Sequence, residues 1–149
     1  MPFLVEKRLL QAALAILSLV PITAGLAGVL EGPQFFRLVA SVPVDSHMRY
    51  LSGLLLGIGV IVWILIPHIE RRGEAFATIT LIVFVGGLSR LWSLVHVGQP
   101  NTVMTCALFV ELGLTPALYL WQRRLAHRLT RGAAIPLSPR RQMLDPVHP

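Results

Sequence analysis

A single arginine interrupts an apolar run in the stretch Phe84-Val85-Gly86-Gly87-Leu88-Ser89-Arg90-Leu91-Trp92. The residues around Arg90 are apolar enough to lie in lipid, where an isolated charge is costly and normally has a partner. Glu111 is the only acidic residue in the next apolar run and is therefore the obvious candidate. The sequence predicts a small membrane bundle with a polar cluster inside it, but it contains no motif that indicates a reaction.

The composition also indicates a membrane protein. Only 13% of the 149 residues are charged and the mean hydropathy is +0.69, whereas soluble proteins contain about 25% charged residues. The formal net charge is +6, but the basic residues lie in short blocks beside apolar spans, without interleaved aromatic residues. This pattern favours anionic lipid headgroups as partners over nucleic acid. The single cysteine, Cys106, excludes an internal disulfide.

The apolar runs predict an all-α, four-helix transmembrane bundle with up-down-up-down topology. A secretory signal with a cleavage site near Gly25-Leu26-Ala27 is the alternative for the first span, but the apolar run continues past that site. We expect an N-terminus of residues 1–8, a membrane domain of residues 9–125 and a basic, partly disordered tail of residues 126–149. The predicted spans are 9–30, 47–66, 75–97 and 103–121.

Basic residues near the span ends predict the orientation. The N-terminus, the second loop and the C-terminal tail hold ten Lys and Arg residues, whereas the first loop and the edge of the second span hold only Arg37 and Arg49. Because loops rich in Lys and Arg stay on the cytoplasmic side, both termini are predicted to be cytoplasmic.

Helix boundaries are predicted from capping residues. Asp45 or Ser46 is placed to cap a helix that starts at about His47, and Pro67 ends that helix. Gly98 is the expected C-cap of the third span, and Asn101 or Thr102 the N-cap of the fourth. The connection of residues 31–46 predicts an interfacial loop or short surface helix around Phe35 and Phe36.

Small residues indicate where helices approach one another. Ala24, Gly25, Ala27 and Gly28 form one such surface on the first span. The other predicted packing positions are Gly53, Gly57, Gly86 and Gly87.

Arg90 and Glu111 are predicted to share a depth of roughly 10 to 13 Å below the outer surface, from the helical rise per residue. Side chains lean toward the N-terminus of their helix, so on antiparallel neighbours these two converge. An unpaired arginine at such a depth costs about 2.5 to 3.5 kcal/mol. The sequence therefore predicts an ion pair, and Thr115 is placed to bond the carboxylate or its own helix backbone.

A polar funnel in the outer half is the candidate ligand site. It would bind a small anionic metabolite or a quinone headgroup. The structural alternative is that Arg90 and Glu111 only lock two helices and that Asp45 is a helix cap. His47 and His96 could face each other as haem or metal ligands, but no CxxCH or HExxH motif supports this. No catalytic residue, metal site or cofactor is evident, although a quinone is compatible with the cluster. Its predicted members are Asp45, His47, Arg49, Tyr50, Arg90 and Glu111.

Four stretches together resemble a known family: Asp45-Ser46-His47-Met48-Arg49-Tyr50-Leu51-Ser52-Gly53, Pro67-His68-Ile69-Glu70-Arg71-Arg72, Gly86-Gly87-Leu88-Ser89-Arg90-Leu91, and Glu111 in the last span. They are similar to the bacterial membrane family called domain of unknown function 4345, over about residues 9–125. That family resembles the wider DoxX-like group of four-helix membrane proteins, some of which are associated with quinone-linked sulfur oxidation or redox complexes. The resemblance implies a multi-pass protein of the bacterial cytoplasmic (inner) membrane, and it supplies no catalytic residue.

Two function classes follow. In the first, the cluster binds a small ligand and the protein acts as a redox accessory or carrier. In the second, the protein is an interaction subunit whose glycine faces dock other membrane proteins or a second copy of the chain. A proton-linked transporter is a third class, which is less favoured because four helices are few for alternating access and no inverted repeat is visible.

Overall fold

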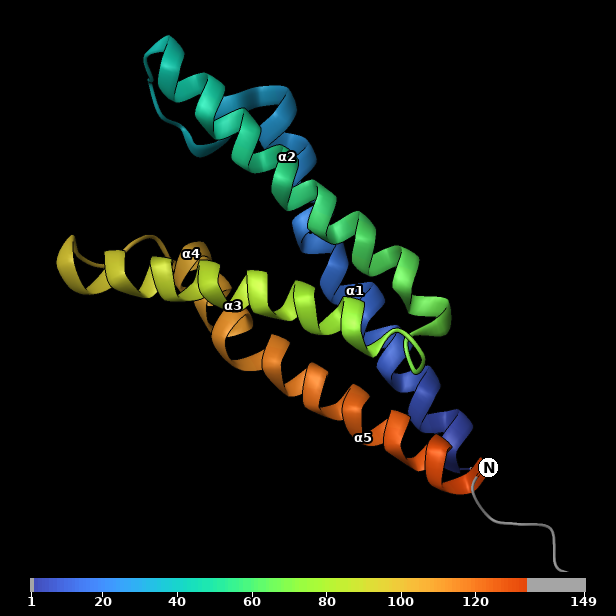
Figure 1. The fold of residues 1–149 in the computed structure, drawn as a ribbon. Coiled ribbons are helices and arrows are strands. Elements are labelled where there is room, and N and C mark those ends of the chain that lie inside the picture. The colour runs from blue at the N-terminus through green and yellow to red at the C-terminus, as the bar shows by residue number, and fades with distance from the viewer. Residues whose placement is uncertain (1, 134–149) are drawn as a thin grey trace, which may run out of the picture.

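The computed structural model describes residues 2–133 (Figure 1). In chain order the elements are α1 (Pro2–Glu31), η1 (Gly32–Phe36), α2 (Val42–Leu65), η2 (Ile66–His68), α3 (Gly73–His96), α4 (Thr102–Phe109), η3 (Val110–Leu114) and α5 (Thr115–Ala133). The elements η1 and η2 are short 3-10 helices and η3 is a π-helical turn. No strand occurs in residues 2–133, which confirms the all-α prediction.

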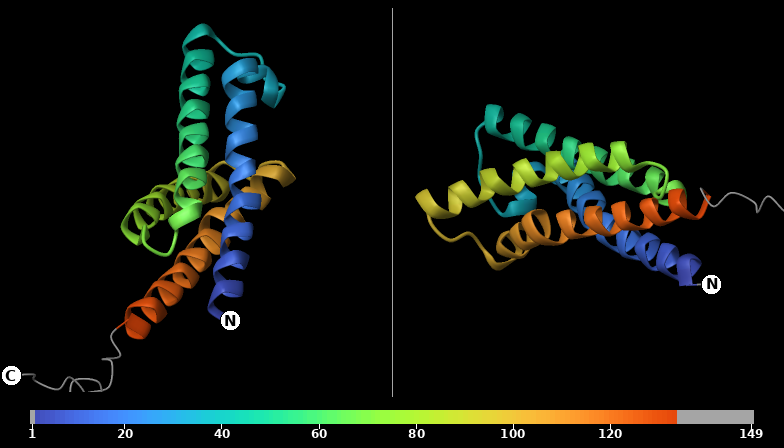
Figure 2. Two further views of the ribbon diagram at one scale, coloured as in Figure 1. Left: turned by 90° about the vertical axis from the view of Figure 1, so that its right-hand side faces the viewer. Right: turned by 60° about the horizontal axis from the view of Figure 1, so that its bottom comes forward.

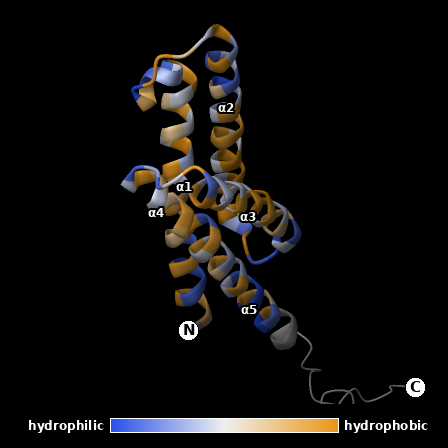
Figure 3. Ribbon diagram, turned by 90° about the vertical axis from the view of Figure 1, so that its left-hand side faces the viewer, coloured by the Kyte–Doolittle hydropathy of each residue, from blue (hydrophilic) through white to orange (hydrophobic). Residues whose placement is uncertain are grey.

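Four helical segments are long and apolar enough to cross a membrane: Phe3–Phe36, Val42–His68, Gly73–His96 and Thr102–Leu129. Their directions alternate along the chain (Figure 1). Apart from Val97, the predicted spans lie inside these segments. The four-helix membrane architecture is therefore confirmed. Figure 3 shows that hydrophobic residues dominate the long helices and that hydrophilic residues gather toward helix ends and connections.

The helices form two arms. Helices α1 and α2 run side by side, and α3 lies beside the α4–α5 span (Figures 1 and 2). From their short connection at residues 69–72, α2 and α3 diverge, so the start of α2 and the end of α3 lie apart in Figures 1 and 2. The start of α1 lies near the end of α5, where Glu6 and Arg128 form an ion pair of 2.6 Å.

Small residues bring α1 and α2 together. A Cβ atom added at Gly25 would lie 2.5 Å from the backbone nitrogen of Leu56, and one added at Gly28 would collide with Ser52 Oγ. The predicted small surface of α1 is thus in close contact with α2. On α2, however, a Cβ at Gly57 would have nothing within 4 Å. A Cβ at Gly53 would make only an ordinary contact with α1, at 3.9 Å from Val29 Cγ2, and the tight contact of α2 lies instead at Gly59, where a Cβ would be 2.7 Å from Ile22 Cγ1.

The hydrophobic core lies where the two arms meet, near the α2–α3 connection. Every long helix contributes to it, because apolar side chains there face other helices instead of lipid. Its buried members are Leu10, Leu14, Leu65, Ile69, Phe76, Ile79, Leu118 and Leu125. This core fixes one end of the bundle and leaves the opposite ends of α2 and α3 free to diverge.

Helix α2 starts earlier than predicted. It begins at Val42, and Pro43 lies in its first turn, where a proline costs nothing because that N–H would have no helical partner. Ser41 occupies the N-cap position without a side-chain hydrogen bond, and Asp45 lies inside the first turn. The prediction that Asp45 or Ser46 caps this helix was therefore wrong.

The other boundary predictions have different outcomes. The Asn101 side chain accepts a hydrogen bond of 3.0 Å from the Met104 N–H, which confirms Asn101 as the N-cap of α4. The C-cap of α3 is Val97, one residue before the predicted Gly98, which follows it with a φ of +123°, a conformation that favours glycine. Pro67 follows the end of α2, and η1 is the predicted short helix at Phe35 and Phe36. Helix α5 extends past Trp121 to Ala133, and the disorder predicted beyond Ala134 lies outside the described residues.

Candidate functional site

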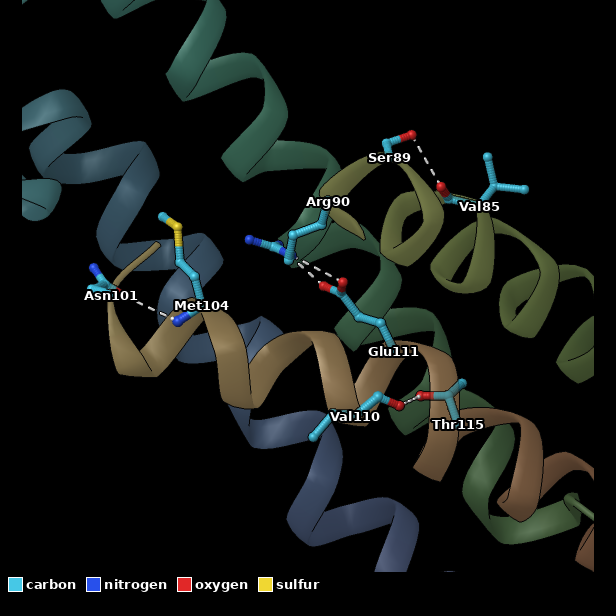
Figure 4. A network of polar contacts seen from close by, with 8 residues as sticks. All are labelled: Val85, Ser89, Arg90, Asn101, Met104, Val110, Glu111 and Thr115. Carbon is cyan, nitrogen blue, oxygen red and sulfur yellow. Dashed lines mark hydrogen bonds and ion pairs between the residues drawn. The ribbon is translucent and has the colours of Figure 1, made fainter. Parts of the chain in front are cut away.

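Arg90 and Glu111 form a two-bond ion pair between α3 and η3. Arg90 Nε donates to Glu111 Oε2 at 3.0 Å, and Arg90 Nη2 donates to Glu111 Oε1 at 3.1 Å (Figure 4). The side chains are 34% and 19% exposed. Such parallel bonds match the planar guanidinium to the planar carboxylate and fix the geometry of both groups. The residues that we expected to meet between antiparallel neighbours therefore do meet.

The carboxylate comes from the π-helical turn Val110–Leu114, which sequence reasoning missed. Thr115 Oγ1 donates to the carbonyl of Val110, five residues earlier, at 2.9 Å (Figure 4). Thr115 was predicted to bond either the Glu111 carboxylate or its own helix backbone, and it bonds the backbone. A signal was present in Pro116, which has no N–H and whose ring clashes with the carbonyl of Leu112 in a regular α-helix. Such π turns occur mostly inside α-helices and often at functional sites.

Gly87 allows the π turn to approach α3. A Cβ atom added there would lie 2.7 Å from Leu112 Cδ2 and 2.9 Å from Glu111 Cβ. The neighbouring residue Gly86 has nothing within 4 Å of its added Cβ. Of the two glycines predicted to pack, only Gly87 makes a close contact in the described residues. It lies on the turn that precedes Arg90, so it helps to bring the ion pair within hydrogen-bonding distance.

A second arginine–carboxylate pair lies on α2. Arg49 donates to Asp45 Oδ2 from Nε at 2.9 Å and to Asp45 Oδ1 from Nη2 at 3.3 Å. Arg49 Nη1 also donates to the carbonyls of Val29 and Leu30, at 2.6 and 2.9 Å. Those carbonyls are at the end of α1, where no intrahelical donor is available to them. Arg49 therefore caps α1 and ties it to α2.

Gly32 makes room for this cap. Its φ is +62°, which glycine adopts readily, and a Cβ there would lie 2.7 Å from Arg49 Nη2. A larger residue would be strained and would displace the guanidinium. The cap thus depends on one glycine directly after α1.

The two remaining members of the predicted cluster are exposed. Tyr50 is 62% exposed and His47 is also exposed, and within residues 2–133 neither hydrogen-bonds to either arginine pair. His96 stacks on Trp92 with ring centroids 3.9 Å apart. The structure thus brings together Arg90 with Glu111 and Asp45 with Arg49, and it does not join the two pairs. Within residues 2–133, no group of three or more His, Cys, Asp or Glu side chains is placed to hold a metal ion.

A further polar network at the opposite end was not predicted. Lys7 pairs with Glu70 at 2.8 Å, and Glu6 accepts hydrogen bonds from Trp121 and Arg128 at 3.2 and 2.6 Å. The available signal was the position of these charges, since the start of the first span and the loop after the second span share one face of the membrane. This network joins α1 to the α2–α3 connection and to α5.

The surroundings of Glu70 act on its pKa in opposite directions. Burial raises the pKa, whereas the hydrogen bond from Lys7, a backbone hydrogen bond and the charges of Lys7 and Arg71 lower it. The sum is a pKa below the ordinary value of 4.5. Glu70 is therefore a carboxylate at neutral pH, held by a cation from another helix.

Comparison with known proteins places the chain in a family. Neither the curated proteins nor the solved structures contained a match to the chain. One family profile, described as domain of unknown function (DUF4345), matches residues 9–122, which include all four membrane-capable segments in whole or in part. The match covers the Arg90–Glu111 pair, the Asp45–Arg49 pair and Glu70. The chain therefore belongs to the DUF4345 family of domains of unknown function.

Proposed function

We propose that this membrane protein binds a small molecule with a carbonyl or anionic group, such as a quinone headgroup or an anionic metabolite, at Arg90. It would act as a redox accessory or carrier. The observation that supports this is the unused edge of the guanidinium. Nε and Nη2 bond to Glu111, whereas Nη1 has no hydrogen-bond partner among residues 2–133. Figure 4 shows a guanidinium nitrogen directed away from Glu111.

The ion pair allows this edge to donate to a carbonyl or anionic ligand without leaving an uncompensated charge in the apolar span. Glu111 compensates the positive charge, so the guanidinium is tolerated in an apolar span while its remaining N–H groups stay available. An arginine inside lipid gains from any further acceptor, because unpaired donors there have no water to bond. A quinone carbonyl is such an acceptor. Arg49 lacks this capacity because its Nη1 is occupied by two backbone carbonyls.

Binding to a double variant tests the proposal. Arg90→Gln combined with Glu111→Gln removes both charges without leaving either one unpaired. Purified protein in lipid nanodiscs would be titrated with a water-soluble quinone analogue and with a small dicarboxylate. We expect the double variant to lose about tenfold in affinity for the ligand that binds, which corresponds to one charge-assisted hydrogen bond. Ser89→Ala is the matched control, because within residues 2–133 the Ser89 hydroxyl bonds only to the Val85 carbonyl of its own helix. Unchanged affinity in the double variant would refute the proposal.

We also propose that the protein lies in the bacterial cytoplasmic membrane with both termini inside, and that its family is related to the DoxX-like group. The positions of the basic residues support the orientation. The start of α1, the α2–α3 connection and the end of α5 meet at one end, where Lys7 and Arg128 form ion pairs. Cytoplasmic ends are typically rich in such residues. Cysteine labelling of an added residue near each terminus in intact cells would test it, and labelling from outside would refute it.

The second candidate is an interaction subunit, and two open glycines favour it. An added Cβ at Gly57 or Gly86 meets nothing within 4 Å in the described residues, so both positions offer a flat surface for another helix. Gly57→Leu and Gly86→Leu would then release a partner protein or a second copy, which blue-native electrophoresis in mild detergent would detect. A wild-type protein that migrates as a lone monomer would count against this function.

A further inference from the structure

A pocket lies at the end of the fold opposite to the Asp45–Arg49 pair, between the α2–α3 connection and α5. Its volume is about 630 Å³. Charges of both signs line it, from Arg71 and Arg72 in the connection, Arg123 on α5, and Glu70 and Glu74. Because residues 69–72 join two membrane-capable helices, this pocket lies at the depth of lipid headgroups. It is separate from the site at Arg90.

The positive part of the pocket suits a phosphate group. Arg71, Arg72 and Arg123 are exposed. Gly73, Glu74 and Ala75, the first residues of α3, also line the pocket, and no side chain caps this helix at its N-cap, Arg72. The first N–H groups of a helix lack intrahelical partners and, with the helix dipole, favour an anion. Three arginines line the same pocket as these N–H groups and give it an appropriate charge for a phosphate.

The acceptor part of the pocket calls for a hydrogen-bond donor. Gln122 is completely buried and lines the pocket; its Nε2 donates to the Ile69 carbonyl at 2.8 Å, but its Oε1 accepts no hydrogen bond in the described residues. Glu70 Oε2 is likewise buried without a donor. Buried polar atoms rarely remain unpaired, because each costs about 1 to 3 kcal/mol. Gly73 lies directly against the Gln122 amide, since an added Cβ would lie 3.3 Å from Nε2 and 3.6 Å from Oε1.

We infer that this pocket binds the headgroup of phosphatidylethanolamine. Its phosphodiester would lie against the arginines and the start of α3. Its ammonium, which carries three N–H donors and a positive charge, would face Glu74 and the unpaired oxygens of Glu70 and Gln122. A choline headgroup has the same two charges but no N–H donor, and a glycerol headgroup has hydroxyl donors but no positive charge. The ethanolamine headgroup alone among these three satisfies both parts of the pocket.

Native mass spectrometry of the full chain in mild detergent tests the inference. The probes are phosphatidylethanolamine, phosphatidylcholine and phosphatidylglycerol with identical acyl chains, and free phosphoethanolamine. We expect phosphatidylethanolamine to bind about tenfold more tightly than phosphatidylcholine, as for the loss of charge-assisted hydrogen bonds. Equal binding of these two lipids, or tighter binding of phosphatidylglycerol, would overturn the inference. Free phosphoethanolamine that binds as tightly as the lipid would also overturn it, because the ligand would then be a soluble phosphate ester.

Two exposed positions, Arg72 and Glu74, test the two parts of the site separately. Arg72→Gln should weaken the binding of phosphatidylethanolamine and phosphatidylcholine alike, because both carry the phosphate. Glu74→Gln should reduce only the preference for ethanolamine over choline. Arg124→Gln is the matched control, since Arg124 is exposed on α5 next to Arg123 but does not line the pocket. Equal effects of Arg123→Gln and Arg124→Gln would show that general positive charge, and not this pocket, attracts the lipid.

Discussion

Arg49 and Arg90 each hold a carboxylate through two hydrogen bonds, yet the two pairs differ in what they join. Asp45 and Arg49 lie one turn apart on α2, so their bond can form within a single helix. Arg90 and Glu111 lie on different membrane segments and can bond only when α3 and η3 are neighbours. Arg49 uses its third nitrogen to cap α1, whereas Nη1 of Arg90 stays unused within residues 2–133. All three nitrogens of the Arg49 guanidinium therefore have partners in the fold, whereas Arg90 retains one nitrogen that can donate to a ligand.

The largest difference between the pairs should appear on removal of the carboxylate. Glu111→Leu leaves Arg90 unpaired in an apolar span and should cost about 3 kcal/mol of unfolding free energy. Asp45→Leu should cost less, because Arg49 keeps its two backbone carbonyls. Unfolding by SDS titration in mixed micelles would measure both. Equal losses of unfolding free energy in the two variants would contradict this difference, because Arg90 would then need Glu111 no more than Arg49 needs Asp45.

Removal of the cap should have the next largest effect. Arg49→Gln leaves the Val29 and Leu30 carbonyls without their donor and should cost about 2 kcal/mol. Arg49→Lys should recover part of this loss, because an ammonium group can still donate to some of the four acceptor atoms. The recovery should be incomplete, because a single ammonium cannot reach all four. Ligand affinity at Arg90 should not change in either variant, which the nanodisc titration would check. A fall in affinity would show that the two pairs act as one site after all.

Neighbouring glycines sharpen the comparison at the ion pair. Gly87→Ala places a methyl group against Leu112 and Glu111 and should cost about 1 kcal/mol or more through overpacking. Gly86→Ala, one residue earlier, meets nothing within 4 Å among the described residues and should be close to neutral. The same SDS titration would compare them. If Gly86→Ala proved the more damaging, the packing of η3 against α3 would be different from the one described here.

The smallest effect should be the pH dependence of stability that Glu70 causes, at the end of the fold opposite to the Asp45–Arg49 pair. The pKa of Glu70 is lowered in the folded protein, so its contribution to stability is complete above about 4.5, its ordinary value, and is lost as the pH falls through the lower folded value. Glu70→Gln should therefore flatten the stability curve in this acidic range. Unfolding between pH 7 and pH 3 would measure this. The exposed Glu74→Gln variant is the control, and a curve unchanged by Glu70→Gln would contradict the assignment.

Part of this structure could be predicted from the sequence. Arg90 and Glu111 are each the only charge in an apolar run, and consecutive spans joined by a short turn must be neighbours, so their meeting followed from depth and direction alone. Asn101 was recognisable as an N-cap because asparagine is a preferred residue at that position and here comes directly before an apolar run. Such local signals depend on few residues and survive any tilt of the helices.

The rest depended on tilt, which span lengths do not determine. We expected Arg49, His47 and Tyr50 at the start of α2 to face Arg90. Helices α2 and α3 diverge from the core at their connection, however, so the start of α2 lies apart from the end of α3 (Figures 1 and 2). Arg49 also donates to two carbonyls at the end of α1, where Gly32 has no Cβ and so leaves room for the guanidinium. Gly59 packs against α1 where we expected Gly57 to do so. The face that α2 presents to α1 depends on how the helix is rotated, which span lengths do not determine either.

The most direct test of the Arg90–Glu111 pair is its reversal. The unfolding free energy would be measured for Arg90→Glu, for Glu111→Arg and for the two changes together. We expect each single variant to be destabilised and the double variant to regain more than about 1 kcal/mol relative to the sum of the two losses, because the charges attract in either order. Additive losses would contradict the account, because they would mean that these two side chains do not interact in the folded protein.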